Sequence, residues 1–171
     1  MLDTGETAPD MTLPMATPEA AAAKPRGEYR TADVERFELS ETLADGPVTL
    51  VTIPGVYSQG CTEELCTIAD RHTDLGELPG QVYALSADTP WSQLAFIDEY
   101  DISYPLLSGF NSDVLRQLGV RRPDGILQGI ATRTAFVIGP DRDVAYTWEA
   151  DDSLVPDFDA VTDAVAAAET D

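Results

Sequence analysis

The chain has 171 residues, 43% of them apolar, and a formal net charge of −21 at pH 7. This length predicts one domain spanning residues 1–171 with a substantial core, and the absence of any run of about 18 apolar residues argues against a membrane span. Because 31 acidic residues face only ten basic ones, we expect no nucleic-acid partner.

The acidic residues are spread along the whole chain rather than blocked at one end. This distribution favours adaptation to a salty, halophilic cytoplasm, because salt shortens the Debye length and relieves self-repulsion. The alternative is an ordinary acidic protein with a disordered tail. The N-terminus is acidic and poor in apolar residues, unlike a signal peptide, so we expect a soluble, cytoplasmic protein.

The first 46 residues predict little regular structure. Residues 1–28 contain four prolines and are expected to form an extended entry and a loop, with at most a short helical turn at Glu19–Lys24. A hairpin or edge strand is expected over Tyr29–Leu39, and a brief turn or helix over Ser40–Ala44. Asp45-Gly46 is a turn signal that precedes the central stretch.

The central stretch begins with a short β-branched apolar run, Val48 to Ile53, which is typical of a strand covered on both faces. Pro54-Gly55 ends this strand. Helix formers follow from Thr62 to about Leu75, and Glu63 and Glu64 are predicted in the first helical turn, where acidic side chains suit the helix dipole.

Cys61 is therefore predicted at or near a helix N-terminus. Such a position favours the thiolate over the thiol, which makes Cys61 a candidate nucleophile. Ser58, three residues earlier, adds a hydroxyl to the same turn. The alternative is that Cys61 is a small apolar core residue, as many free cysteines are.

Strands and helices then alternate, which predicts an α/β fold: a three-layer sandwich with a mixed central sheet. A late antiparallel hairpin is signalled by Gly139-Pro140-Asp141. The expected elements are a strand at Val82–Ser86, a helix from Pro90 to Tyr100, a strand at Tyr104–Leu107, a small helix around Val114–Leu118, a loop at Arg121–Gly129, strands at Thr132–Ile138 and Asp143–Trp148, and a final helix carrying Phe158, Val161, Ala164 and Val165.

Pro54-x-x-x-Ser58-x-x-Cys61 resembles the active-site signature of peroxiredoxins, in which Pro, Thr or Ser, and the peroxidatic Cys have this spacing. Glu64 stands where peroxiredoxins carry Glu or Gln, and Cys66 stands at the resolving position of the bacterioferritin-comigratory-type subgroup. The resemblance extends to three further stretches: Gly5-x-x-Ala8-Pro9-Asp10-Met11-x-Leu13, Ser86-Ala87-Asp88, and Arg133-x-x-Phe136-Val137-Ile138. One departure is Ser58, since most members have Thr there.

This resemblance implies a thioredoxin-like fold and a thiol peroxidase that reduces hydrogen peroxide and organic hydroperoxides. It implies that Cys61 attacks the peroxide and that a disulfide with Cys66 recycles it. The alternative is that Cys66 is a buried core residue, which would leave a one-Cys enzyme. Because residues five apart on a helix lie too far apart for a disulfide, we expect two separate thiols in the reduced protein. Ser58 would hydrogen-bond the thiolate and the peroxide, Arg133 would supply charge, and Pro54 would shield the site. A thioredoxin-like or other thiol protein would be the reductant, and the enzyme would be a monomer or homodimer.

No cofactor is expected, and metal is poorly supported because the chain has two cysteines and one histidine, His72, which we expect to be a solvated surface residue. Two alternative functions stay open. A dithiol–disulfide oxidoreductase could use the same fold, although such enzymes usually carry Cys-x-x-Cys. A non-enzymatic redox sensor or holdase could use oxidation of Cys61 to regulate a partner.

Overall fold

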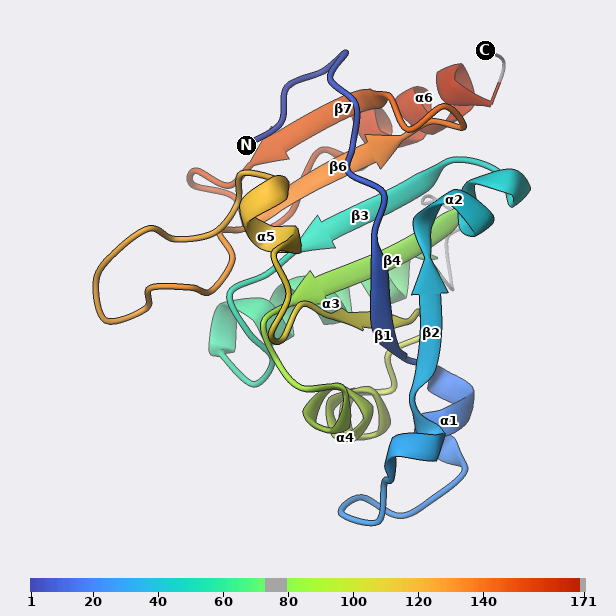
Figure 1. Ribbon diagram of the computed structural model, residues 1–171, viewed down its shortest axis with the longest axis vertical. Coiled ribbons are helices and arrows are strands. Elements are labelled where there is room, and N and C mark those ends of the chain that lie inside the picture. The colour runs from blue at the N-terminus through green and yellow to red at the C-terminus, as the bar shows by residue number, and fades with distance from the viewer. Residues whose placement is uncertain (73–79, 170–171) are drawn as a thin grey trace.

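The computed structural model describes residues 1–72 and 80–169. Its centre is a mixed sheet (Figure 1). The strands are β1 (Thr12–Ala16), β2 (Glu35–Glu38), β3 (Val48–Thr52), β4 (Gln81–Ser86), β5 (Leu106–Ser108), β6 (Thr134–Ile138) and β7 (Val144–Glu149). They form one seven-stranded sheet in the order β2-β1-β5-β4-β3-β6-β7.

The predicted central strand is confirmed. Every residue of β3 is buried, as expected for a strand with helices on both faces. β3 runs parallel to β4, and β4 runs parallel to β5, whereas β6 is antiparallel to β3. The carboxyl ends of β3, β4 and β5 therefore meet at one edge of the sheet, and the amino end of β6 joins them there.

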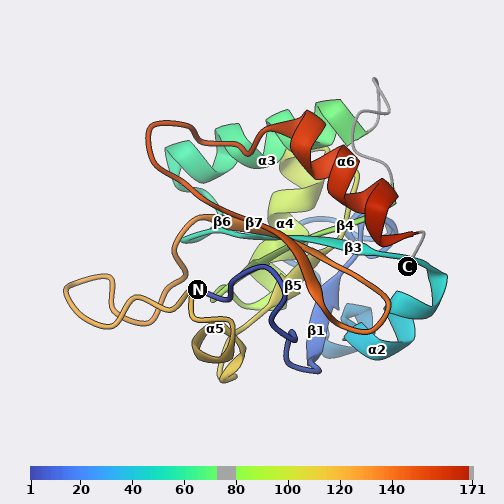
Figure 2. The same cartoon turned by 90° about the horizontal axis from the view of Figure 1, so that it is seen from above.

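Helices cover both faces of the sheet, which confirms the three-layer prediction. The helices are α1 (Pro18–Ala22), α2 (Leu39–Thr42), α3 (Gln59–Asp70), α4 (Pro90–Tyr100), α5 (Val114–Gln117) and α6 (Phe158–Ala168), with short 3₁₀ turns at Thr31–Asp33 and Leu43–Asp45. Figure 2 shows α3 and α6 on one side of the sheet and α2 and α5 on the other. One apolar core lies beneath α3, α4 and α6, and a second lies beneath α2 and α5.

The N-terminal segment is more regular than expected. β1 lies between β2 and β5, although the sequence indicated only an extended entry. Pro14 is unusual in such a strand, because proline is found mainly on edge strands. The register explains why the strand tolerates this proline: β5 pairs only with Met15 and Ala16, and Pro14 lies beyond that short ladder. Tertiary pairing thus sets a strand that local signals did not indicate.

The later elements follow the prediction closely, including the β6–β7 hairpin and the final helix. α3 is different: it begins at Gln59, three residues before the predicted Thr62. The described helix ends at Asp70, and the predicted end near Leu75 lies outside the described residues. Within residues 1–72 and 80–169, no helix combines the length and apolar character needed to cross a membrane.

Candidate active site

Ser58 explains why α3 starts early. Its backbone is extended, and its side-chain Oγ accepts a hydrogen bond from the Cys61 N–H at 3.4 Å, which is the N-cap arrangement. Cys61 is consequently the third helical residue, inside the first turn. The side chain of Cys61 is 0% exposed, so its sulfur meets the positive end of the helix in a site shielded from bulk water.

The prediction for Glu63 and Glu64 is wrong. Because α3 begins at Gln59, both residues follow the first turn, which holds no acidic side chain. Glu63 is exposed, whereas Glu64 is 0% exposed. Glu64 therefore acts through a direct contact inside the protein rather than through the helix dipole.

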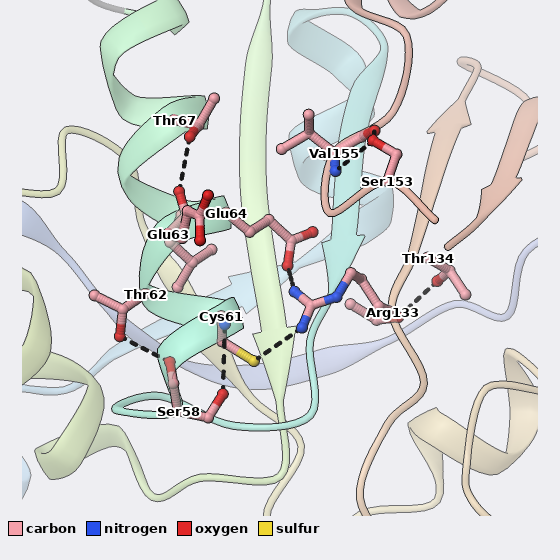
Figure 3. Close-up of polar contacts among 12 residues, drawn as sticks. Ser58, Cys61, Thr62, Glu63, Glu64, Thr67, Arg133, Thr134, Ser153 and Val155 are labelled. Carbon is pink, nitrogen blue, oxygen red and sulfur yellow. Dashed lines mark hydrogen bonds and ion pairs between the residues drawn. The ribbon is translucent and has the colours of Figure 1, made fainter. Parts of the chain in front are cut away.

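That contact is with Arg133, which immediately precedes β6 and whose carbonyl accepts a hydrogen bond from the Ala150 N–H at 3.0 Å. The Arg133 Nη2 donates to Cys61 Sγ at 3.6 Å, and Nη1 donates to Glu64 Oε2. Figure 3 shows this guanidinium lying between the sulfur and the carboxyl group. The structure thus joins Cys61 to a residue 72 positions away in the chain.

The Glu64 carboxyl group has an unusual environment. Its Oε1 has no hydrogen-bond partner in the described structure. Burial raises the pKa of Glu64 to about 8, although the charge and hydrogen bond of Arg133 act in the opposite direction. Protonation of Glu64 and the charge available to Cys61 are therefore linked through Arg133.

Gly60 permits the close approach of Arg133 to α3. A Cβ atom at this position would lie 3.3 Å from Arg133 Nη2 and 3.6 Å from a methyl group of Leu154. A larger residue would thus meet the guanidinium on one side and the segment after β7 on the other. The sequence alone did not indicate that Gly60 makes room for Arg133, because the two residues are far apart in the chain.

The loop that carries Pro54 is fastened to the end of β4. The Asp88 Oδ2 accepts hydrogen bonds from the Val56 N–H at 2.9 Å and from the Ser86 hydroxyl at 2.6 Å. Gln93 Nε2 donates to the same hydroxyl at 3.0 Å. Pro54 is half-buried beside this anchored segment. Asp88 was part of the family resemblance, yet its contact with the loop was not predicted.

Cys66 lies on the same helix, five residues after Cys61, and the two thiols are not bonded. Burial, together with the charge of Asp70, raises the pKa of the half-buried Cys66 thiol. The structure therefore has two separate thiols, as expected from helical geometry.

Two other expectations can be compared with the structure. His72 is half-buried and its ring meets Tyr104 edge-on, so it is less exposed to solvent than expected. Ser58 was expected to hydrogen-bond the Cys61 sulfur. Its Oγ instead accepts a hydrogen bond from the Cys61 N–H, and among the described residues no hydrogen bond joins it to the sulfur. Among the described residues, no group of three or more His, Cys, Asp or Glu side chains could hold a metal ion.

The arrangement favours an anionic sulfur. A capped helix N-terminus and an arginine both meet Cys61, and both stabilise a thiolate. The same groups would stabilise negative charge that develops on an oxygen beside the sulfur.

Comparison with known proteins identifies the family. The AhpC/TSA family matches residues 4–147. The chain is 34% identical over 145 residues to Rv1608c of Mycobacterium tuberculosis, which carries a peroxiredoxin name, covering 84% of this chain and 82% of that protein. The chain belongs to the AhpC/TSA family of peroxiredoxins. As a peroxiredoxin, it is a thiol-dependent peroxidase, which implies a hydroperoxide substrate and a thiol reductant.

Solved structures of peroxiredoxins confirm the expected thioredoxin-like fold. Peroxidoxin BcpB from Mycobacterium tuberculosis matches with a TM-score of 0.72 and 30% identity, covering 99% of this chain and 98% of that one. AhpC from the same organism matches with a TM-score of 0.78 at 16% identity, covering 98% and 93%. Peroxiredoxin bcp1 of Schizosaccharomyces pombe is a further relative, 26% identical over 124 residues, covering 72% of this chain and 55% of that protein.

Proposed function

We propose that Cys61 is the peroxidatic residue of this peroxidase, with hydrogen peroxide and organic hydroperoxides as substrates. The observation that carries the proposal is the 3.6 Å contact between Arg133 Nη2 and Cys61 Sγ in the first turn of a capped helix. The thiolate sulfur forms a bond to one peroxide oxygen while the O–O bond breaks. The second oxygen leaves as hydroxide or alkoxide and takes up a proton, and the oxidised sulfur becomes a sulfenic acid.

The neighbouring residues take separate roles in this proposal. Arg133 stabilises the thiolate and the charge on the departing oxygen. The Ser58 oxygen accepts from the Cys61 N–H, so its own O–H is available to donate to the peroxide. Glu64 holds Arg133 from the side opposite the sulfur, and Pro54 shields the site from water.

We further propose that Cys66 resolves the sulfenic acid. The Cys66 sulfur bonds to the Cys61 sulfur, and the sulfenic hydroxyl leaves as water with the thiol proton. In an ideal helix, residues five positions apart have Cα atoms about 8.6 Å apart and side chains some 140° apart around the axis. Because a disulfide requires a Cα separation below about 7 Å, α3 must unwind locally between the two residues.

The remaining parts of the proposal concern partners and organisation. A thioredoxin-like or other thiol protein would reduce the Cys61–Cys66 disulfide and return both thiols. The chain would work as one domain over residues 1–171, which the single continuous sheet supports, and as a monomer or homodimer.

Peroxide consumption with a coupled thioredoxin system, measured in high salt, tests the proposal. Cys61→Ser should abolish consumption, and Cys66→Ser should leave one oxidation per chain without turnover by thioredoxin. Full turnover by Cys61→Ser would refute the role of Cys61. Stoichiometric consumption by the unaltered protein, with reductant present, would favour a redox sensor instead.

A further inference from the structure

Tyr57 has a backbone conformation that its side chain does not favour. It stands between the anchored loop and the N-cap residue Ser58, with φ at 66°. This left-handed region suits Gly and Asn, whereas a bulky residue found there is an outlier. The surrounding contacts must therefore hold Tyr57 in place, since such conformations persist only where neighbouring structure determines them.

Those contacts come from α4. The Tyr57 ring meets the Phe96 ring edge-on, with centroids 5.2 Å apart, and the Tyr100 ring at 6.2 Å. Phe96 and Tyr100 also pack on each other at 4.7 Å. Because Phe96 is fully buried, the Tyr57 ring rests on a fixed part of the core, and such aromatic pairs contribute beyond their buried area.

The Tyr57 hydroxyl adds a polar contact to α4. Partial burial, and the charge and hydrogen bond of Glu99, raise the pKa of Tyr57 to about 12. Arg26 in turn forms ion pairs with two carboxylates of α4: its Nη1 lies 3.3 Å from Glu99 Oε2, and its Nε lies 2.7 Å from Asp98 Oδ2. Glu99 is thus held from one side while it accepts from Tyr57 on the other.

We propose that Tyr57 is a positioning residue for Cys61, acting through Ser58. The ring, packed on α4, keeps residue 57 in its left-handed turn, and this turn directs the chain so that Ser58 caps α3 and meets the Cys61 N–H. Release of the ring lets the loop relax, which moves the Ser58 hydroxyl and weakens the cap beside the sulfur. The inference rests on the proposed role of Cys61 and concerns a residue with no part in the chemistry itself.

Four substitutions test this role in a Cys66→Ser background. The second-order rate constant with hydrogen peroxide should fall by about tenfold or more in Tyr57→Ala, because small misplacement of reacting groups is costly. Tyr57→Gly should also lose rate, although glycine removes the backbone strain. Tyr57→Phe should stay within about threefold of the parent, because it keeps the ring and loses only one hydrogen bond. Tyr100→Ala removes a partner ring without altering the loop, and should lower the rate in the same direction.

A second readout separates positioning from folding. The rate of alkylation of Cys61 by iodoacetamide should fall in Tyr57→Ala and Tyr57→Gly and recover in Tyr57→Phe, whereas all three variants should keep the far-ultraviolet circular dichroism of the parent. Trp91→Ala is the matched control, because Trp91 is an aromatic residue on α4, 44% exposed, with no ring contact to the loop within the described residues. Its rates of peroxide reaction and alkylation should match those of the parent.

Two results would overturn the proposal. One is an unchanged rate of peroxide reaction and of alkylation in Tyr57→Gly and Tyr100→Ala, which would show that ring packing does not hold the site. The other is a loss in Tyr57→Phe as large as that in Tyr57→Ala. An active Cys61→Ser variant would instead refute the proposed function, so the two failures are distinguishable.

Discussion

Replacing Glu64 with Gln should change how the stability of the protein depends on pH. Raising the pKa of Glu64 from its ordinary value of 4.5 to about 8 makes its deprotonation in the folded protein less favourable by about 5 kcal/mol, since tenfold in an equilibrium constant is about 1.4 kcal/mol. A group with a raised folded pKa contributes its full stability below pH 4.5 and loses it as the pH rises to about 8.

Gln keeps the shape of the protonated acid and cannot ionise, so the variant lacks this loss. Between pH 5 and pH 8, the unaltered protein should lose about 3 to 4 kcal/mol of unfolding free energy relative to Glu64→Gln. The other acidic groups are common to both proteins and cancel in the difference. Urea unfolding followed by tryptophan fluorescence at the two pH values measures it.

Glu63→Gln is the matched control for the substitution itself, because Glu63 is exposed on the same helix. A constant difference for Glu64→Gln would show that Glu64 does not titrate in this range. A difference of opposite sign would show that attraction to Arg133 outweighs burial and that the pKa of Glu64 is not raised.

Three further predictions concern the site and the charge of the chain. Arg133→Ala should lower the second-order rate constant of Cys61 with hydrogen peroxide by about tenfold or more, measured with Cys66 replaced, because the guanidinium stabilises the charge that develops on the departing oxygen; no change would remove Arg133 from the site. Ser58→Ala should lower the rate with peroxide by one to three orders of magnitude, since a donor aimed at developing charge is worth about 2.7–4 kcal/mol. Ser58→Gly should lose the same rate while it retains most of the cap stability, so an active glycine variant would contradict the role of the hydroxyl. Added salt should raise the melting temperature by screening the net charge of −21, and a melting temperature independent of salt would contradict adaptation to a salty medium.

Much of the fold could be predicted because its elements carry strong local signals. The apolar run from Val48 to Ile53 predicted β3, and Gly139-Pro140-Asp141 predicted the turn between β6 and β7. β1 could not be predicted, since it is held between β2 and a β5 strand about 90 positions away, and Pro14 argues against a strand. Long-range pairing outweighs local propensity there.

The residues of the candidate site could be predicted where a sequence motif contains them, but not where their positions depend on packing. The active-site signature indicated Cys61 and Ser58, and the family resemblance indicated Arg133. The burial of Glu64 was missed because the helix start was placed at Thr62, although a Ser three residues before Cys61 is itself an N-cap signal. The left-handed turn at Tyr57 has no sequence signal, because tyrosine rarely adopts it and α4 holds it there.

The proposed function requires Cys61 to react first with peroxide. Mass spectrometry of peptides from the Cys66→Ser variant, treated with one equivalent of hydrogen peroxide and a sulfenic-acid trapping reagent, shows whether it does. We expect the trapped adduct on the Cys61 peptide, and in the unaltered protein a linked Cys61–Cys66 peptide that has lost two hydrogens. Unmodified Cys61 in the variant, together with first oxidation at Cys66 in the unaltered protein, would rule out Cys61 as the peroxidatic residue.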